Sequence, residues 1–158
     1  MQKAFLKTIQ LHQKIIHKVS RVYRDTREDQ QDLFQEIVFQ LWKSFPDFRG
    51  DSKVSTWIYR IALNTAISQL NKQKKRGNHV PIDEALMNKP DVGDHLEEEQ
   101  LSILYDQIKK LNPIEKGIIL LYLEGKTYEE IAAITGFSAS NTGTRLNRIK
   151  QKLKAQIK

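Results

Sequence analysis

The sequence predicts an all-α protein of two small helical domains joined by a flexible acidic linker. Apolar residues recur at helical spacing, as in Leu33, Ile37 and Leu41, and no segment alternates long enough to be a strand. Residues 77–98 instead carry glycines, prolines and carboxylates without periodicity. A structureless stretch of that length is uncommon inside one compact domain, so we place the two domains at residues 1–76 and 99–158.

The net charge of +7 is unevenly distributed along the chain. Residues 1–76 hold 15 Lys and Arg against 7 Asp and Glu, residues 77–100 hold 1 against 7, and residues 101–158 hold 10 against 5. Two basic blocks therefore flank one acidic segment. Basic blocks suit a polyanion such as nucleic acid, although Lys-rich helices that are merely soluble have the same composition.

Composition also limits the location and the chemistry. The chain has no cysteine, so it has neither a disulfide framework nor a thiolate metal site, consistent with a reducing cytosol. Its longest apolar run, residues 118–123, is too short to span a bilayer, and the N-terminus lacks a signal-peptide pattern. We expect a cytoplasmic protein.

The first informative helix covers residues 32–42. Leu33, Ile37, Val38 and Leu41 are expected to face inward. A second face carries an acidic and polar patch made by Asp32, Gln35 and Glu36. In a domain of charge +8 this patch suits a basic protein surface, and a plain solvated face is equally consistent with the spacing.

The next segment is a small polar loop that opens into a helix with a buried face. Interleaved aromatic, basic and amide groups are suited to single-stranded DNA, because bases stack on aromatic rings while cations follow the backbone. A pocket beside the loop would hold an extruded base. Tyr59, Arg60, Asn64 and Ser68 are expected on a face other than the buried one, and the alternative is that Trp57 and Tyr59 are core aromatics. The candidate residues are Arg49, Ser52, Lys53, Ser55, Trp57, Tyr59, Arg60, Asn64, Ser68 and Lys72.

The C-terminal part contains three helix starts. Asn112 is an N-cap, with Pro113 at the first helical position and Glu115 reaching back in a capping box. Thr127 caps a short helix that ends at Gly136, a residue suited to a left-handed turn. A further helix, capped by Ser138, follows at once. This order predicts a helix-turn-helix.

The second helix of that motif is a candidate for duplex recognition. From residue 137 onward there are six basic residues and no acidic one. Short polar side chains reach base edges in the major groove while Arg and Lys hold phosphates. An ordinary helical hairpin with a basic face is the alternative. The candidate residues are Ser138, Ser140, Asn141, Thr144, Arg145, Arg148 and Lys152.

Three blocks resemble the extracytoplasmic-function (ECF) sigma factors, which are small bacterial transcription initiation factors. They are DLFQEIVFQLW at 32–42, FRGDSKVSTWIYRIALNTAISQL at 48–70 and YLEGKTYEEIAAITGFSASNTGTRLNRIKQKL at 122–153. The blocks stand in family order and at family spacing. The resemblance implies that residues 1–76 form sigma region 2, that residues 99–158 form region 4, and that the protein is not an enzyme.

The resemblance also implies a role for each block. The patch of Asp32, Gln35 and Glu36 would dock on the clamp coiled coil of the polymerase beta-prime subunit. The loop at 48–56 would capture a flipped non-template base of the minus-10 element, and the helix from Trp57 would read and melt that element. The helix from Ser138 would read the minus-35 element as duplex.

Partners follow from the same resemblance. They are core RNA polymerase, through its clamp coiled coil and beta flap, and promoter DNA, both duplex and melted. An anti-sigma factor is a further candidate partner. No cofactor, metal or small-molecule substrate is implied.

Three positions depart from the family pattern. Ser68 stands where many members have Asp, Thr142 where many have a β-branched apolar residue, and Gly143 where many have a basic one. The promoter sequences are therefore not predicted. Gly143 lowers helix propensity but would let DNA approach the backbone closely.

Two other classes of protein compete with this interpretation. A stand-alone helix-turn-helix regulator would explain residues 111–158 but not the blocks at 32–42 and 48–65. A magnesium-dependent nuclease would use the carboxylates clustered on one helix. No second ligand cluster and no nucleophile–base pair accompanies them, so we predict no enzymatic activity. The carboxylates in question are Asp25, Glu28, Asp29, Asp32 and Glu36.

Overall fold

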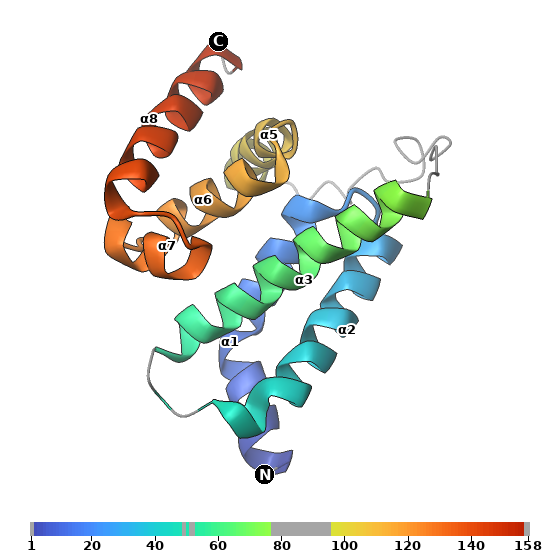
Figure 1. Ribbon diagram of the computed structural model, residues 1–158. Coiled ribbons are helices and arrows are strands. Elements are labelled where there is room, and N and C mark those ends of the chain that lie inside the picture. The colour runs from blue at the N-terminus through green and yellow to red at the C-terminus, as the bar shows by residue number, and fades with distance from the viewer. Residues whose placement is uncertain (1, 49, 51–52, 77–95, 157–158) are drawn as a thin grey trace. The chain divides into compact units, whose positions relative to one another are not determined.

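The computed structural model describes residues 2–48, 50, 53–76 and 96–156. Within these ranges every regular element is a helix, and the chain divides into two compact units, Met1–Met87 and Asn88–Lys158 (Figure 1). The prediction of an all-α protein with two helical domains is confirmed. Most of the predicted linker lies outside the described residues, but its last three positions belong to a helix.

The first unit is a bundle of three long helices. They are α1 (Gln2–Tyr23), α2 (Arg27–Ser44) and α3 (Val54–Arg76), with a short 3-10 turn, η1 (Phe45–Asp47), after α2. Each long helix packs against the other two, side by side in Figure 1. Thr26 begins α2 as its N-cap, because its hydroxyl accepts a hydrogen bond from the Asp29 backbone N–H at 2.9 Å.

Aliphatic side chains from all three helices fill this bundle. Ile16 and Val19 of α1, Leu33 and Ile37 of α2, and Ile58 of α3 are essentially inaccessible to solvent. Burying each such side chain contributes about 1.5–3 kcal/mol. The inward-facing set expected on α2 is buried except for Val38, which is half-buried.

A buried cation closes one end of the bundle. Arg24, between α1 and α2, is only 8% exposed. Its guanidinium donates to the Tyr23 carbonyl at 2.8 Å and to Gln69 Oε1 of α3 at 3.1 Å. Desolvation by burial lowers the pKa of Arg24, and the nearby carboxylates of Asp29 and Asp25 act against that shift. Arg24 thus links the turn before α2 to the later part of α3.

The second unit contains α5 (Leu96–Lys109), α6 (Pro113–Leu123), α7 (Tyr128–Thr135) and α8 (Ala139–Gln156). The capping box predicted at the start of α6 is present. Asn112 Oδ1 accepts from the Glu115 N–H at 2.8 Å, and Glu115 Oε1 accepts from the Asn112 N–H at 3.1 Å. Thr127 and Glu130 form a second capping box at the start of α7.

The turn between α7 and α8 has the predicted geometry. Gly136 lies in the left-handed region with φ of 88°, and its N–H donates to the Ala132 carbonyl. Ser138 Oγ then accepts from the Asn141 N–H at 3.0 Å and caps α8. Since α8 packs against α5, α6 and α7, this helix-turn-helix is held by the rest of its unit.

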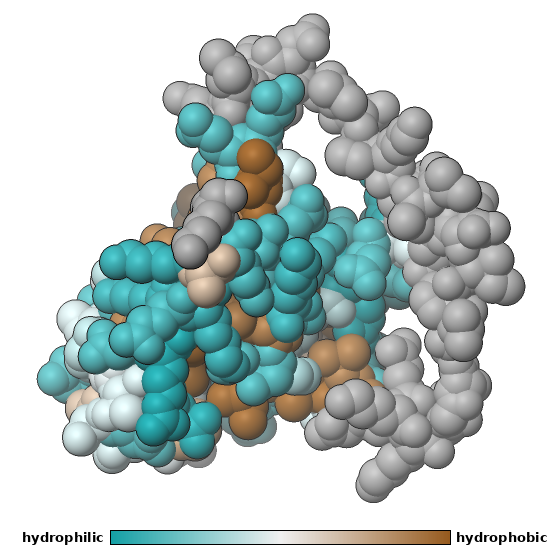
Figure 2. All heavy atoms as spheres, turned by 90° about the horizontal axis from the view of Figure 1, so that it is seen from above, coloured by the Kyte–Doolittle hydropathy of each residue, from teal (hydrophilic) through white to brown (hydrophobic). Residues whose placement is uncertain are grey.

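The core of the second unit is built around α6 and α8. Ile118, Leu120 and Leu121 of α6 and Leu146 and Ile149 of α8 are 0–1% exposed. On the face shown in Figure 2, hydrophilic side chains cover most of the described surface, with smaller hydrophobic patches between them. Among the described helices, none is both long and apolar enough to cross a membrane.

Candidate nucleic-acid interface

The outer face of α8 is the first part of the candidate interface. Thr142, Leu146, Ile149 and Leu153 are buried at spacings of three and four residues, so one stripe of α8 faces the core. The side chains opposite that stripe lie in solvent. They include the predicted residues Ser140, Asn141, Thr144 and Arg148, together with Asn147 and Gln151, and all six are exposed.

Asn147 and Gln151 were not among the residues predicted to contact duplex DNA. Both carry amides, which pair with adenine edges in the major groove. The buried apolar positions Leu146 and Ile149, readable from the sequence, define the opposite face on a helical wheel and would have included both.

Two other predicted residues, Arg145 and Lys152, lie on one flank of α8 and already have partners within the unit. The Arg145 guanidinium lies over the Phe137 ring, 4.1 Å from its centroid. The Lys152 ammonium donates to Glu115 Oε2 at 2.6 Å. These two cations are therefore less available for contacts with DNA than the sequence alone suggested.

The opposite flank of α8 contains Gly143. A Cβ built at this position would lie 3.2 Å from Cε2 of the Tyr128 ring. The side-chain space at Gly143 is thus occupied by Tyr128 of α7, which gives this glycine a packing role between the two helices. The expectation that Gly143 admits DNA to the backbone finds no support in this arrangement.

The start of α3 differs from the sequence-based expectation. Four consecutive residues near the start of α3, Thr56 to Tyr59, are buried, with Trp57 7% and Tyr59 1% exposed. The placement of Tyr59 away from the buried face was wrong: α1 and α2 both pack against α3, and Tyr59 is buried in the bundle that they form.

Trp57 belongs to an aromatic cluster at the base of the loop that precedes α3. Its indole stacks on Phe48, with centroids 4.7 Å apart, and lies 6.1 Å from the Phe45 ring. Phe45 in turn makes an edge contact with Phe5 of α1. The alternative interpretation of Trp57 and Tyr59 as core aromatics therefore fits the structure.

The remaining candidates at this end of the chain are more accessible. Asn64 and Ser68 are exposed on α3, Arg60 is half-buried one turn before Asn64, and Lys53 is exposed just before the helix. Arg60, Asn64 and Ser68 follow one another at four-residue spacing and share a face. Ser55 is half-buried. Arg49 and Ser52, and the side chain of Lys72, lie outside the described residues.

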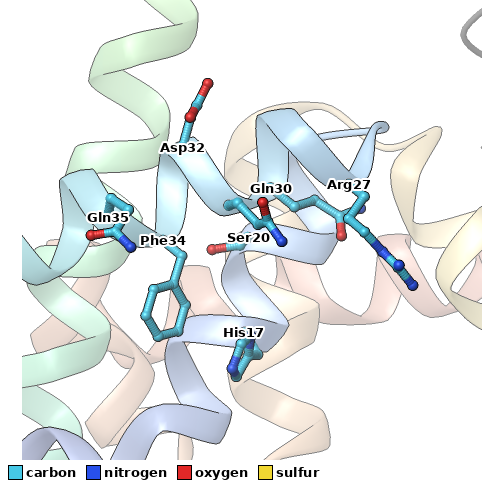
Figure 3. A pocket seen from close by; sticks show the side chains of 8 residues that line it. His17, Ser20, Arg27, Gln30, Asp32, Phe34 and Gln35 are labelled. Carbon is cyan, nitrogen blue, oxygen red and sulfur yellow. The ribbon is translucent and has the colours of Figure 1, made fainter.

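The acidic patch on α2 is accessible. Asp32 and Gln35 are exposed, whereas Glu36 is half-buried and accepts a hydrogen bond from Gln40 Nε2 at 3.0 Å. Beside it lies a hollow of about 500 Å³ between α1 and α2. In Figure 3, Phe34 points toward His17, their centroids 4.5 Å apart, while the Asp32 carboxylate points away from both. The lining residues are His17, Ser20, Arg27, Gln30, Gln31, Asp32, Phe34 and Gln35.

Across the described parts of the chain, no three His, Cys, Asp or Glu side chains lie close enough together to hold a metal ion. The carboxylates on α2 therefore do not converge on a common point there. The interface offers hydrogen-bonding groups and cations, which suit recognition of nucleic acid.

Comparison with known proteins identifies the family. The family model for Sigma-70 region 2 matches residues 8–76, and the model for Sigma-70 region 4 matches residues 101–153. The ECF RNA polymerase sigma-E factor of Haemophilus influenzae is 34% identical over 144 residues, which cover 84% of this chain and 76% of that protein. The sigma-E factor of Escherichia coli K12 is 30% identical over 169 residues, covering 99% and 87%.

Two solved structures share the fold. The sigma factor RpoE of Bartonella quintana, crystallised with the anti-sigma factor NepR, superposes with a TM-score of 0.75 at 20% identity, covering 97% of this chain and 96% of its own. The protein CnrH, solved with the cytosolic domain of CnrY, gives a TM-score of 0.71 at 21% identity, covering 99% and 89%.

Two helical units that match sigma regions 2 and 4 define a transcription initiation factor of the sigma-70 type. This chain belongs to the ECF sigma factor family, whose members are non-enzymatic factors that direct RNA polymerase to specific promoters. The resemblance noted in the sequence is confirmed. A stand-alone regulator is not favoured, because it has no place for the region 2 match.

Proposed function

We propose that the two units divide promoter recognition between them. The first unit docks on core RNA polymerase through α2 and opens the minus-10 element with α3 and the loop before it. The second unit reads the minus-35 element as duplex with α8. The protein would act in the cytoplasm, where its polymerase and promoters are.

The outer face of α8 is the observation that carries the duplex assignment. Its exposed side chains are hydroxyls, amides and one cation, and the helix is the second of a helix-turn-helix. A helix placed this way enters the major groove, where such groups meet base edges. We assign Ser140, Thr144, Asn147, Arg148 and Gln151 to the base-reading face.

For the minus-10 element, the burial of Trp57 and Tyr59 shifts the assignment to their neighbours. The row of Arg60, Asn64 and Ser68 offers a cation and two hydrogen-bonding groups to unpaired bases. Trp57 supports them indirectly, because it anchors the loop through Phe48. Arg49, Ser52 and Lys72 stay in this assignment as sequence-based predictions.

For docking on polymerase, the exposed Asp32 and Gln35 and the half-buried Glu36 support a contact with a basic surface. The clamp coiled coil of the beta-prime subunit is the proposed surface, and the beta flap is the proposed contact of the second unit. The neighbours solved with NepR and with CnrY also make an anti-sigma factor a proposed partner of this chain.

Run-off transcription tests the proposal directly. Core polymerase from the source organism is combined with genomic fragments, with and without this protein. Discrete transcripts that require the protein, starting downstream of a shared pair of elements, are the expected result. If no transcripts appear but the protein alone shifts one duplex sharply, it acts as a regulator and α3 has no melting role.

A further inference from the structure

The Glu115 carboxylate, in the first turn of α6, has two hydrogen-bonded partners. Its Oε1 accepts from the Asn112 backbone N–H at 3.1 Å and completes the capping box. Its Oε2 accepts from the Lys152 ammonium of α8 at 2.6 Å. The Glu115 side chain is only 13% exposed, whereas that of Lys152 is 52% exposed. One carboxylate thus joins the start of α6 to the later turns of α8.

A second cation on the same flank also interacts with this carboxylate. Arg145 precedes Lys152 by two helical turns, and its guanidinium lies over Phe137. Burial alone would raise the pKa of Glu115, but hydrogen bonds from Lys152 and Asn112 and the charges of Lys152 and Arg145 outweigh it and lower the pKa. Glu115 is therefore ionised at neutral pH.

We propose that Glu115 limits the sequence-independent affinity of the α8 interface for duplex DNA. It neutralises Lys152 and attracts Arg145, so neither cation adds its full charge to binding that ignores sequence. Affinity for any duplex comes from phosphate contacts, whereas discrimination comes from base contacts. A carboxylate that pairs with the cations on this flank weakens the phosphate contacts. It leaves unchanged the outer face, which supplies the base contacts. This inference rests on the proposed placement of α8 in duplex DNA.

The size of the effect follows from counterion release. Each additional phosphate contact makes the slope of log affinity against log salt about 0.9 more negative on duplex DNA. Releasing Lys152 should therefore steepen the slope by about that amount, which corresponds to about a threefold to fourfold effect over a fourfold change in salt. Glu115→Gln removes the charge and keeps the cap, because Gln also completes a capping box.

The experiment uses the full chain and a fluorescent duplex of mixed sequence, with binding followed by anisotropy over a series of salt concentrations. Glu115→Gln should bind more tightly at low salt and show the steeper slope. Glu129→Gln is the matched control, since it removes the same charge from an exposed site on α7. It should change the slope much less.

Lys152→Gln, made alone and together with Glu115→Gln, completes a double-mutant cycle. In the natural background it should change the slope little, because Glu115 already neutralises Lys152. In the Glu115→Gln background it should abolish the gain. Equal salt slopes for Glu115→Gln and Glu129→Gln would overturn the inference. So would a salt slope that becomes shallower by the full value of one phosphate contact when Lys152→Gln is made in the natural background.

The holoenzyme on a promoter fragment defined by run-off transcription checks that the effect does not depend on sequence. In Glu115→Gln, affinity for the promoter and for the mixed duplex should rise together, because a phosphate contact strengthens both. A change confined to the promoter would overturn the inference and make a flank cation a base contact. Duplex binding with unchanged slopes would reject this inference alone, whereas no duplex binding by any variant would reject the proposed role of α8 as well.

Discussion

The indole of Trp57 stacks on the ring of Phe48, with the two planes inclined by only 25°. Phe48 precedes the loop and Trp57 follows it, so the loop begins and ends on one aromatic contact. Phe45 continues this contact toward Phe5 of α1. The residues on either side of the loop proposed to capture a base are therefore held together by rings that already pack on one another.

Trp57→Ala should therefore act mainly on stability. We expect a loss of about 3 kcal/mol in the free energy of unfolding of the first unit, because a large buried ring is removed. Trp57→Phe should lose less, since it keeps a ring against Phe48. Urea unfolding measures both, and Phe39→Ala, at a 52% exposed ring, is the control. Full stability in Trp57→Ala, with melting restored by a pre-melted template, would instead make Trp57 a base contact.

Thr142→Val should stabilise the second unit. The Thr142 hydroxyl is fully buried and has no hydrogen-bond partner among the described residues. Replacing it by a methyl group of similar shape removes a desolvation penalty of about 1 kcal/mol. The midpoint of urea unfolding should rise without a change in slope, whereas Thr144→Val, at an exposed site, should have little effect. A destabilised Thr142→Val variant would show that the hydroxyl is satisfied.

Gly143→Ala tests the packing between α7 and α8. Alanine gains about 1 kcal/mol of helix propensity over glycine. The new Cβ, however, would lie 3.2 Å from the Tyr128 ring, which must shift to make room. We expect little net change in stability in the natural background and a clear gain in a Tyr128→Ala background. Equal gains in both backgrounds, measured by thermal unfolding, would mean that Tyr128 does not restrict this site.

Local features of the fold could be predicted from the sequence, whereas features that depend on packing between helices could not. The capping box at Asn112, the cap at Thr127 and the left-handed Gly136 were predicted because their partners lie within four residues. The burial of Tyr59 was not, because it depends on how two other helices pack against α3. The same holds for Arg24, whose partner Gln69 is 45 positions away.

The candidate site shows the same division. Residues on the outer face of α8 follow from helical periodicity, since the buried stripe fixes the exposed one. The pairing of Lys152 with Glu115 joins residues 37 positions apart and depends on how α6 packs against α8. The cations of this helix can therefore be read from the sequence, but not which of them pair with side chains of other elements.

Glu36→Lys should weaken binding to core polymerase and leave the fold intact. Glu36 is half-buried at the edge of the α2 patch, and reversing its charge places a cation against a basic partner. Affinity for core polymerase is measured by fluorescence anisotropy, and circular dichroism checks the fold. Asp47→Lys makes the same charge change at an exposed site in η1 and should bind more nearly normally. Normal affinity in Glu36→Lys would reject the docking assignment.

Arg148→Ala should affect promoter specificity, whereas Arg145→Ala should affect stability as well as binding. Arg148 is exposed on the outer face of α8, so its loss should cost about 1–3 kcal/mol on the promoter and relax sequence preference at one position. Arg145 lies over Phe137, so its loss should affect the stability of the second unit as well as binding. Holoenzyme affinity for the promoter and its single-base variants, measured over a salt series, separates the two. A uniform loss on all sequences with a shallower salt slope would make Arg148 a phosphate contact.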